Sequence, residues 1–209
     1  FRNHFAKAIE RENSDVMAER LRLLTAPFIL RRLKTDPSII DDLPEKSEQI
    51  ITVRMTTEQA ALYKALVNDV EAALQKREGM SRRGLVLASL TRIKQICNHP
   101  AHFLGDGSAV TIKGKHRSGK VEELMRILDQ AIESRERVLI FTQYKAFGDI
   151  LQPYLEDQFG CEIPFLHGGV SKNKRDKMVE EFQTPDGPPA MVLSLKAGGT
   201  GLNLTAASI

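Results

Sequence analysis

The sequence of 209 residues contains no tryptophan and only two cysteines, Cys97 and Cys161. The cysteines have neither metal-ligand nor redox spacing, so we expect reduced thiols in an intracellular protein and no bound metal. No apolar run approaches the roughly 20 residues that span a bilayer, and the first residues, FRNHFAKAIE, have no signal-peptide character. These absences argue against a disulfide scaffold, a cysteine-ligated metal site and a membrane partner.

Neither sign of charge is in marked excess, because 30 Lys and Arg stand against 27 Asp and Glu. This weakly basic balance permits a nucleic-acid partner without requiring one. Apolar residues make up 42% of the chain, enough for the core of one large domain or of a domain with an appendage. The chain begins without Met and ends where a new strand is expected to begin, so we expect a fragment of a longer protein.

The first hundred residues predict mostly helix. Thr56 and Gln59 form a capping-box pattern at the start of a long amphipathic stretch, and His99 with Pro100 ends the next one. The expected elements are a helical segment over 1–33 that is interrupted by Pro27, a loop over 36–44, a half-buried strand over 48–55, and helices over 56–79 and 81–97.

From Lys120 onward, helical patterns alternate with short apolar runs rich in β-branched residues. This alternation indicates βαβ units, right-handed crossovers and a parallel sheet, and so an α/β fold with an incomplete, doubly wound lobe. Pro153 should kink its helix or mark the first turn. The expected helices lie over 121–132, 147–155 and 171–182, and the expected strands over 138–142, 162–166 and 190–195.

Small polar residues and glycines follow each of the three expected strands. Thr142 and Gln143 follow the first, His167 and Gly168 follow the second, and the glycine-rich stretch 196–203 follows the third. Ligands of open α/β sheets bind beyond the carboxyl ends of the strands, and glycines let backbone amides face phosphate. Because no acidic base or activated nucleophile accompanies these residues, the pattern favours binding of nucleic-acid phosphates over covalent catalysis.

A basic run opens the helix that follows His167, and it contains Lys174 and Arg175. Cations near a helix N-terminus oppose the helix dipole, so helix stability does not explain them. Both a solvated face and an anion contact are consistent with this run.

The segment GKHRSGKV over 114–121 matches seven positions of the phosphate loop GxxxxGK[ST]. The eighth position is Val121, which has no hydroxyl to hold Mg²⁺, and the preceding strand is weak. We interpret the segment as a basic loop that caps the next helix at Lys120.

Taken together, several segments resemble the second motor lobe of the Swi/Snf family of DNA-translocating ATPases, within helicase superfamily two. They stand in the order of the family and cover about residues 20–209. The matching segments are PFILRRLKTD at 27–36, DLPEK at 42–46, MTTEQAALY at 55–63, QICNHP at 95–100, SGK at 118–120, LIFTQY at 139–144, LHGGVS at 166–171 and SLKAGGTGLNLTAA at 194–207.

The resemblance implies a RecA-like lobe of the P-loop NTPase type with an N-terminal, mainly helical region. It assigns 1–55 to the end of the first lobe's helical protrusion and its returning strand, 56–115 to the protrusion of the second lobe, and 116–209 to the helicase C-terminal lobe, before the arginine-finger motif. Implied DNA contacts are Thr142, Gln143, His167, Gly168, Lys196, Gly199 and Thr200, with Lys174 and Arg175 as further candidates for DNA or phosphate. Gly201 and Asn203 would lie toward ATP.

For the whole protein the resemblance implies ATP and Mg²⁺ as cofactors. The implied partners are double-stranded DNA, the first motor lobe and a DNA-bound protein as remodelling substrate, in the cytoplasm of a prokaryote or the nucleus of a eukaryote. Phosphoryl transfer needs a phosphate cradle, a held metal and a cationic charge, and this chain has none of the three complete. We therefore expect no catalytic residue in the chain and no ATP hydrolysis by the chain alone.

Three other functions remain as alternatives. A non-catalytic module that binds nucleic acid or protein would bind DNA without any effect of ATP. A stand-alone phosphate-loop NTPase would use Gly114–Val121. A Rossmann oxidoreductase would need GxGxxG after its first strand, which is missing.

Overall fold

The computed structural model describes residues 1–29, 47–75, 79–197 and 201–209. By its contacts the chain divides into two compact units, Phe1–Ile50 and Ile51–Ile209. Within the described ranges, none of the helices combines the length and apolar character that a membrane crossing requires.

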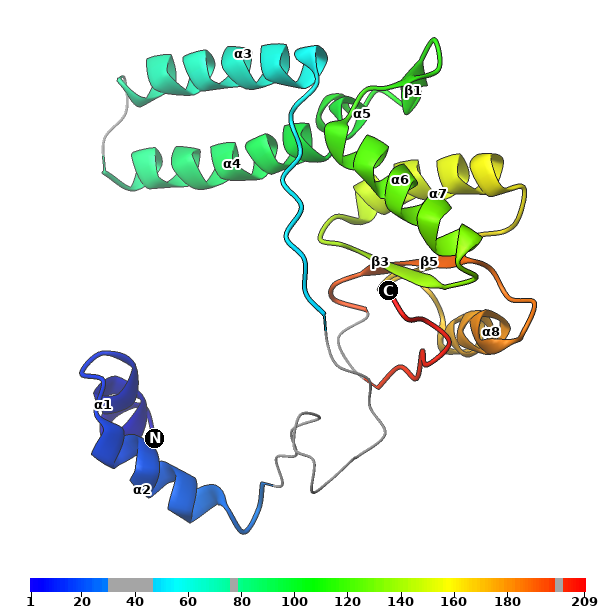
Figure 1. Ribbon diagram of the computed structural model, residues 1–209. Helices are drawn as coiled ribbons and strands as arrows, with labels where there is room; N and C mark the ends of the chain where they lie inside the picture. Colours follow the sequence, from blue (N-terminus) through cyan, green and yellow to red (C-terminus); the bar gives the residue numbers. More distant parts are fainter. Residues whose placement is uncertain (30–46, 76–78, 198–200) are drawn as a thin grey trace. The chain divides into compact units, whose positions relative to one another are not determined.

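The first unit is helical over most of its described length. Ser14 caps its longest helix by accepting a backbone hydrogen bond, and Asn13 before it has a left-handed φ of 47°. The helical segment expected over 1–33 is therefore interrupted well before Pro27, and the loop expected over 36–44 lies outside the described residues. The elements are η1 (Arg2–Ala6), α1 (Lys7–Glu10) and α2 (Asp15–Thr25) (Figure 1).

The half-buried strand expected over 48–55 is wrong, because residues 47–56 have no regular secondary structure. A segment of alternating polarity becomes a strand only where a neighbouring strand completes its hydrogen bonds, and no described segment does so here. Arg54 nevertheless packs closely against the lobe. Its carbonyl oxygen lies so near Gly119 that a methyl group there would not fit.

A helical hairpin opens the second unit, and its two long helices lie side by side (Figure 1). The expected capping box is confirmed: the Thr56 hydroxyl accepts from the Gln59 amide at 3.2 Å, and the Gln59 side chain accepts from the Thr56 amide at 3.1 Å. The elements here are α3 (Thr57–Leu74), α4 (Gly79–Asn98), α5 (Pro100–Leu104) and a small antiparallel hairpin of β1 (Thr111–Ile112) and β2 (Lys115–His116).

The rest of the chain forms the predicted α/β lobe around a parallel sheet of order β3-β5-β4. Pro153 lies inside a helix rather than in its first turn. The elements are α6 (Gly119–Glu133), β3 (Val138–Thr142), α7 (Lys145–Phe159), β4 (Phe165–Leu166), α8 (Lys172–Gln183) and β5 (Ala190–Ser194).

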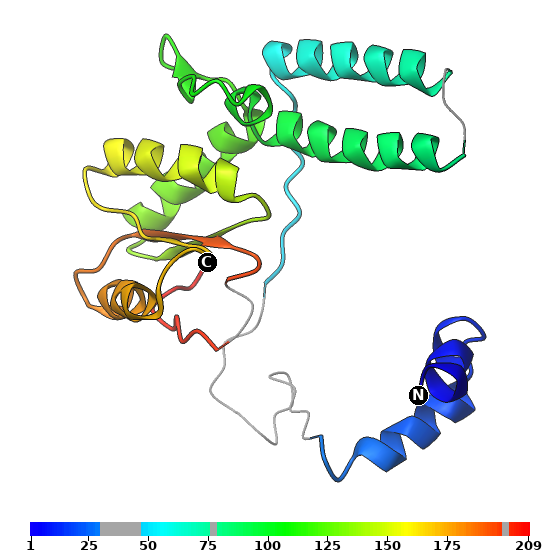
Figure 2. The same cartoon turned by 180° about the vertical axis from the view of Figure 1, so that it is seen from behind.

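Both faces of the sheet are covered, as a doubly wound lobe requires. Figures 1 and 2 show α6 and α7 on one face and α8 on the other. Alternate residues of β5 serve the two cores: Val192 packs with Leu128 and Leu155 of α6 and α7, whereas Leu193 packs with Phe182 of α8. All of these side chains are fully buried. The fold class predicted from the sequence is confirmed.

Strand β4 is shorter than the expected 162–166 because local side chains bind the backbone that would have extended it. The Ile163 amide donates to Glu156 Oε1 at 3.1 Å, and the Ile163 carbonyl accepts from Gln152 Nε2 at 3.0 Å. Pro164 has no amide hydrogen to donate. Only Phe165 and the residue after it are therefore paired as a strand with β5.

Candidate nucleic-acid interface

The carboxyl ends of the three strands meet at one edge of the sheet. Thr142 is in register with Ser194, and Leu166 with Leu193, so β5 lies between the other two strand ends. The Leu195 amide donates to the Thr142 carbonyl at 3.0 Å and joins two of these ends beyond the last paired residues. The residues that follow β3, β4 and β5 therefore leave the sheet along one edge.

Thr142 and Gln143 occupy this edge in different ways. Thr142 is 6% exposed, and its hydroxyl accepts from the Tyr144 amide at 3.2 Å. Its side chain thus shapes the turn after β3. Gln143 is exposed, and its Oε1 lies 3.5 Å from Lys94 Nζ on α4. Of the two, Gln143 is the residue that offers a side chain to solvent.

His167 and Gly168 follow β4. The ring of His167 lies 4.9 Å from that of Phe165, and its Nδ1 accepts from the Gly169 amide at 3.0 Å. Desolvation, with a smaller effect of the Lys145 charge, lowers the pKa of His167, so the imidazole is neutral at pH 7. Gly168 is exposed with open space around its Cα. This end of the sheet offers a neutral imidazole and accessible backbone.

The stretch after β5 is described only in part. Lys196 is exposed, whereas Gly199 and Thr200 lie outside the described residues. Gly201 has a φ of 70°, a left-handed conformation that favours glycine, and both it and Asn203 are exposed. Leu202 and Leu204 pack on the core instead. The segment therefore points alternate residues inward and outward.

The two candidate basic residues on α8, Lys174 and Arg175, do not lie with Gln143. Lys174 is exposed and lines a cavity of about 590 Å³ with Pro164 and Pro189, which precede β4 and β5. Arg175 is half-buried, and its Nε has no hydrogen-bond partner among the described residues. The structure thus does not place Lys174 in the cavity that Gln143 lines.

A cleft of about 470 Å³ adjoins the end of β3, and Thr142 and Gln143 line it. Its other walls come from the end of α4, the start of α6 and the first half of α7, and they include Lys94, Asn98 and Lys120. The sequence did not predict Lys94 and Asn98 as part of a site, and it included Lys120 only in the alternative of a phosphate loop over 114–121. The signal was present, because they lie next to or within the segments QICNHP and SGK.

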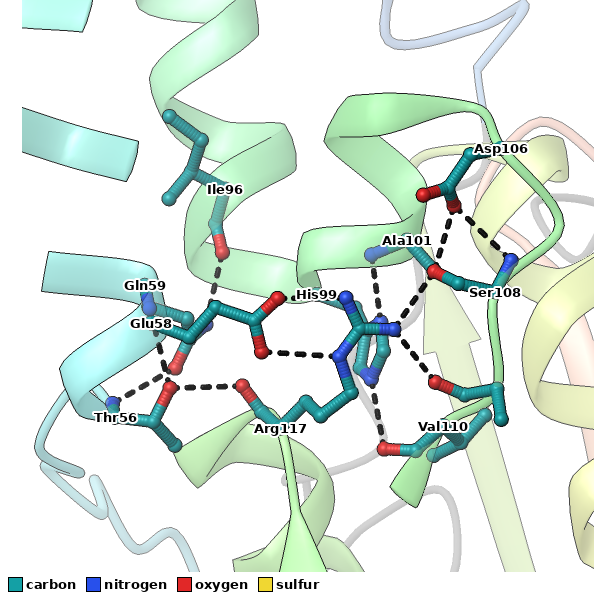
Figure 3. A network of polar contacts seen from close by, with 11 residues as sticks. Thr56, Glu58, Gln59, Ile96, His99, Ala101, Asp106, Ser108, Val110 and Arg117 are labelled. Carbon is teal, nitrogen blue, oxygen red and sulfur yellow. Dashed lines mark hydrogen bonds and ion pairs between the residues drawn. The ribbon is translucent and has the colours of Figure 1, made fainter. Parts of the chain in front are cut away.

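A buried polar junction holds α3, α4 and α6 together beside this cleft (Figure 3). Gln59 is 1% exposed, and its Nε2 donates to the carbonyls of Ile96 at 2.8 Å and Cys97 at 3.2 Å. Its Oε1 accepts from the Gly119 amide at 3.2 Å as well as from the Thr56 cap. One amide side chain therefore joins the starts of α3 and α6 to the end of α4.

Arg117 fastens the segment before α6 to the same junction (Figure 3). Its guanidinium makes a bidentate pair with Glu58, at 2.6 and 2.9 Å, and donates to Ser108 Oγ and the Ala109 carbonyl, both at 2.7 Å. The hydrogen bonds from Arg117 lower the pKa of Glu58. Because Arg117 is 7% exposed and its guanidinium donates four hydrogen bonds within the protein, it acts as a structural residue.

The start of α6 does not form a phosphate loop. The segment 114–117 belongs to the β1–β2 hairpin and to the Arg117 pair, and the Gly119 amide is bonded to Gln59. Ser118 Oγ donates to the Asn98 carbonyl at 2.6 Å and accepts from the Val121 amide at 3.4 Å. Two amides that a phosphate loop would offer to its ligand, those of Gly119 and Val121, are thus bonded to protein side chains, which argues against a stand-alone NTPase at this segment.

A doubly wound parallel lobe with a helical hairpin, and with polar residues gathered at its carboxyl edge, defines a RecA-like lobe of the helicase type. Comparison with known families agrees: residues 1–102 match the SNF2-related domain, and residues 119–209 match the helicase conserved C-terminal domain. The chain belongs to the SNF2 family.

Two similar proteins illustrate the relationship. A putative ATP-dependent helicase/translocase YwqA of Bacillus subtilis is 41% identical over all of this chain, which spans 22% of that protein. The Sulfolobus solfataricus SWI2/SNF2 ATPase core in complex with dsDNA is 37% identical over 99% of this chain and 43% of that one, with a TM-score of 0.71. The chain therefore spans less than half the length of either protein.

Proposed function

We propose that the chain is the C-terminal motor region of an ATP-driven translocase or remodeller of double-stranded DNA. In this assignment, 1–55 ends the helical protrusion of a first lobe, 56–115 is the protrusion of the second lobe, and 116–209 is the RecA-like lobe that grips the DNA backbone. The observation that carries the proposal is the gathering of exposed polar residues at the carboxyl edge of β3, β5 and β4. Relatives named as a translocase and as a core bound to dsDNA support it.

The DNA contacts are assigned to residues along this edge. Gln143 donates from its amide to a phosphate, while Thr142 positions it through the turn. His167 and Gly168 contact the same strand, and neutral imidazole can donate to a phosphate oxygen. Lys196, Gly199 and Thr200 complete the edge, with Lys174 and Arg175 as outer contacts.

The ATP site is shared with the first lobe. Gly201 and Asn203 are assigned to the nucleotide, because an exposed glycine amide and a carboxamide suit phosphate and ribose oxygens. In the whole protein ATP binds with Mg²⁺, whose ligands and phosphate cradle belong to the first lobe. The 209-residue chain alone binds neither productively and does not hydrolyse ATP.

The test uses the intact protein and its Gln143→Ala and Thr200→Ala double variant. We expect weaker duplex binding in a fluorescence anisotropy titration and a matching loss of DNA-stimulated ATP hydrolysis, with hydrolysis in the absence of DNA retained. If the double variant kept the DNA affinity and the DNA-stimulated ATP hydrolysis of the wild type, the assignment of these contacts would be wrong.

The same titration separates the motor from a non-catalytic binding module. A motor changes its DNA affinity between the ATP-bound and ADP-bound states, because lobe closure is coupled to the nucleotide. Equal affinity in the two states, with no ATP hydrolysis by the intact protein, would favour the module.

A further inference from the structure

The cleft at the end of β3 brings together three segments that are distant in the sequence. Lys94 and Asn98 come from α4, Lys120 from the first turn of α6, and Gln143 from the turn after β3. Its volume of about 470 Å³ falls in the range of ~300–1,000 Å³ that is typical of ligand pockets. Its apolar lining includes residues such as Leu124. The cleft thus has an apolar lining beside two ammonium groups and two carboxamides.

The two ammonium groups are paired only with neutral oxygens among the described residues. Lys94 Nζ lies 3.5 Å from Gln143 Oε1, and Lys120 Nζ lies 3.3 Å from Asn98 Oδ1. The described lining of the cleft contains no Asp or Glu. Lys145 differs from these two lysines, because its Nζ lies 2.6 Å from a carboxylate oxygen. The cleft therefore carries two positive charges without a described acidic counterpart.

Local helix stability does not explain Lys120. It lies in the first turn of the 15-residue helix α6, where a cation opposes the helix dipole. The positive end of the dipole and the ammonium groups act in the same direction on an anion in the cleft. Walls of low dielectric constant concentrate this field. The arrangement is unfavourable for the helix by itself and favourable for a bound anion.

We propose that this cleft binds a backbone phosphate of duplex DNA, with Lys94 and Lys120 as its cationic contacts. This inference rests on the proposed function, because Gln143 lines the same cleft and is assigned to the DNA strand. The two lysines extend that contact from the sheet edge onto α4 and α6. The apolar lining accommodates the carbon face of the adjoining sugar.

The experiment measures duplex binding by the intact protein as a function of salt concentration. In B-DNA each lost phosphate contact makes the slope of log K against log salt less steep by about 0.9. We expect the Lys94→Gln and Lys120→Gln double variant to lose about 0.9 in slope, as one lost phosphate contact requires. The Lys94→Arg and Lys120→Arg variant keeps both charges and should keep the slope.

The matched control is Lys113→Gln with Lys115→Gln, at the tip of the β1–β2 hairpin. Both lysines are exposed, and the change in net charge is identical. We expect this control to keep the slope of the wild type. If the hairpin control lost as much slope as the cleft variant, the change in slope would be due to net charge alone, and the inference would be wrong.

The outcomes separate this inference from the function on which it rests. If the wild type shows no salt-dependent duplex binding, both fail. If Gln143→Ala weakens binding while the lysine variant matches the hairpin control, only the cleft assignment fails. Titration with ATP covers the other source of phosphate. A loss of ATP affinity in the lysine variant with an unchanged DNA slope would assign the cleft to free nucleotide and contradict the proposal.

Discussion

Replacing Gln59 with glutamate tests the buried junction beside the cleft. The substitution keeps the shape of the side chain and the acceptor for the Thr56 and Gly119 amides, but it removes the amide group that donates to Ile96 and Cys97. Two buried carbonyls then face an oxygen. Because each buried group left without a partner costs about 1–3 kcal/mol, we expect the free energy of unfolding to fall by about 2–6 kcal/mol.

The pH dependence identifies the cause of this loss. Burial and the two carbonyls raise the pKa of the introduced carboxyl, and its protonated form can donate one hydrogen bond. Part of the lost stability should therefore return as the pH falls from about 7 to about 5. The assay is urea unfolding followed by circular dichroism.

The control for this substitution is Gln130→Glu, on the exposed side of α6. It introduces the same charge without burying it, so its stability should change by less than about 0.5 kcal/mol. If Gln59→Glu behaved like this control at both pH values, Gln59 could not be the buried hydrogen-bonding centre described above.

Two further predictions concern stability. Gly148→Ala places a methyl group against the Phe165 ring, so overpacking that costs about 1–3 kcal/mol should outweigh the helix-propensity gain of about 1 kcal/mol. Gly84→Ala adds a methyl group in open space, so it should stabilise the chain. Equal shifts of the melting temperature in the two variants would contradict this prediction. Burial lowers the pKa of His99 and His102, so below about pH 6.5 the unfolded chain binds more protons than the folded chain. The free energy of unfolding should therefore decrease as the pH is lowered below about 6.5, by at most ~1.4 kcal/mol per pH unit for each histidine. His102→Phe should flatten this dependence in urea unfolding at each pH; a flat wild-type profile would refute it.

The parts of the fold that follow from local patterns were predictable. The capping box at Thr56 could be predicted from the sequence because both of its partners lie within one helical turn. The strands over 138–142 and 190–195 could be predicted because buried parallel strands are continuous apolar runs in the sequence. The parallel sheet followed from the alternation of helices and strands.

The errors arose where distant residues decide the outcome. The alternating segment 48–55 has no described strand to pair with, and the backbone of Ile163 is bonded to side chains of α7. The periodicity within a segment shows neither whether a partner strand is present nor whether distant side chains bind its backbone.

The sequence predicted that the candidate residues follow the strands at one edge of the sheet, but it did not predict the cleft that adjoins this edge. Thr142 and Gln143 follow a recognisable strand, but only the structure shows that the hydroxyl of Thr142 is bonded inside its turn. Lys94 and Lys120 lie on helices where a charged residue is usually solvated. Their presence in one cleft depends on the packing of α4 against α6, which the sequence pattern does not contain.

Contact between the sheet edge and DNA is the central claim, and site-specific photocrosslinking measures it most directly. A photoreactive side chain is placed at position 143 of the intact protein, and a second protein carries it at position 113 in the β1–β2 hairpin. We predict crosslinks to duplex DNA from position 143 that change with the bound nucleotide, and none above background from position 113. Equal crosslinking from the two positions, or none from position 143 when DNA is bound, would contradict the account.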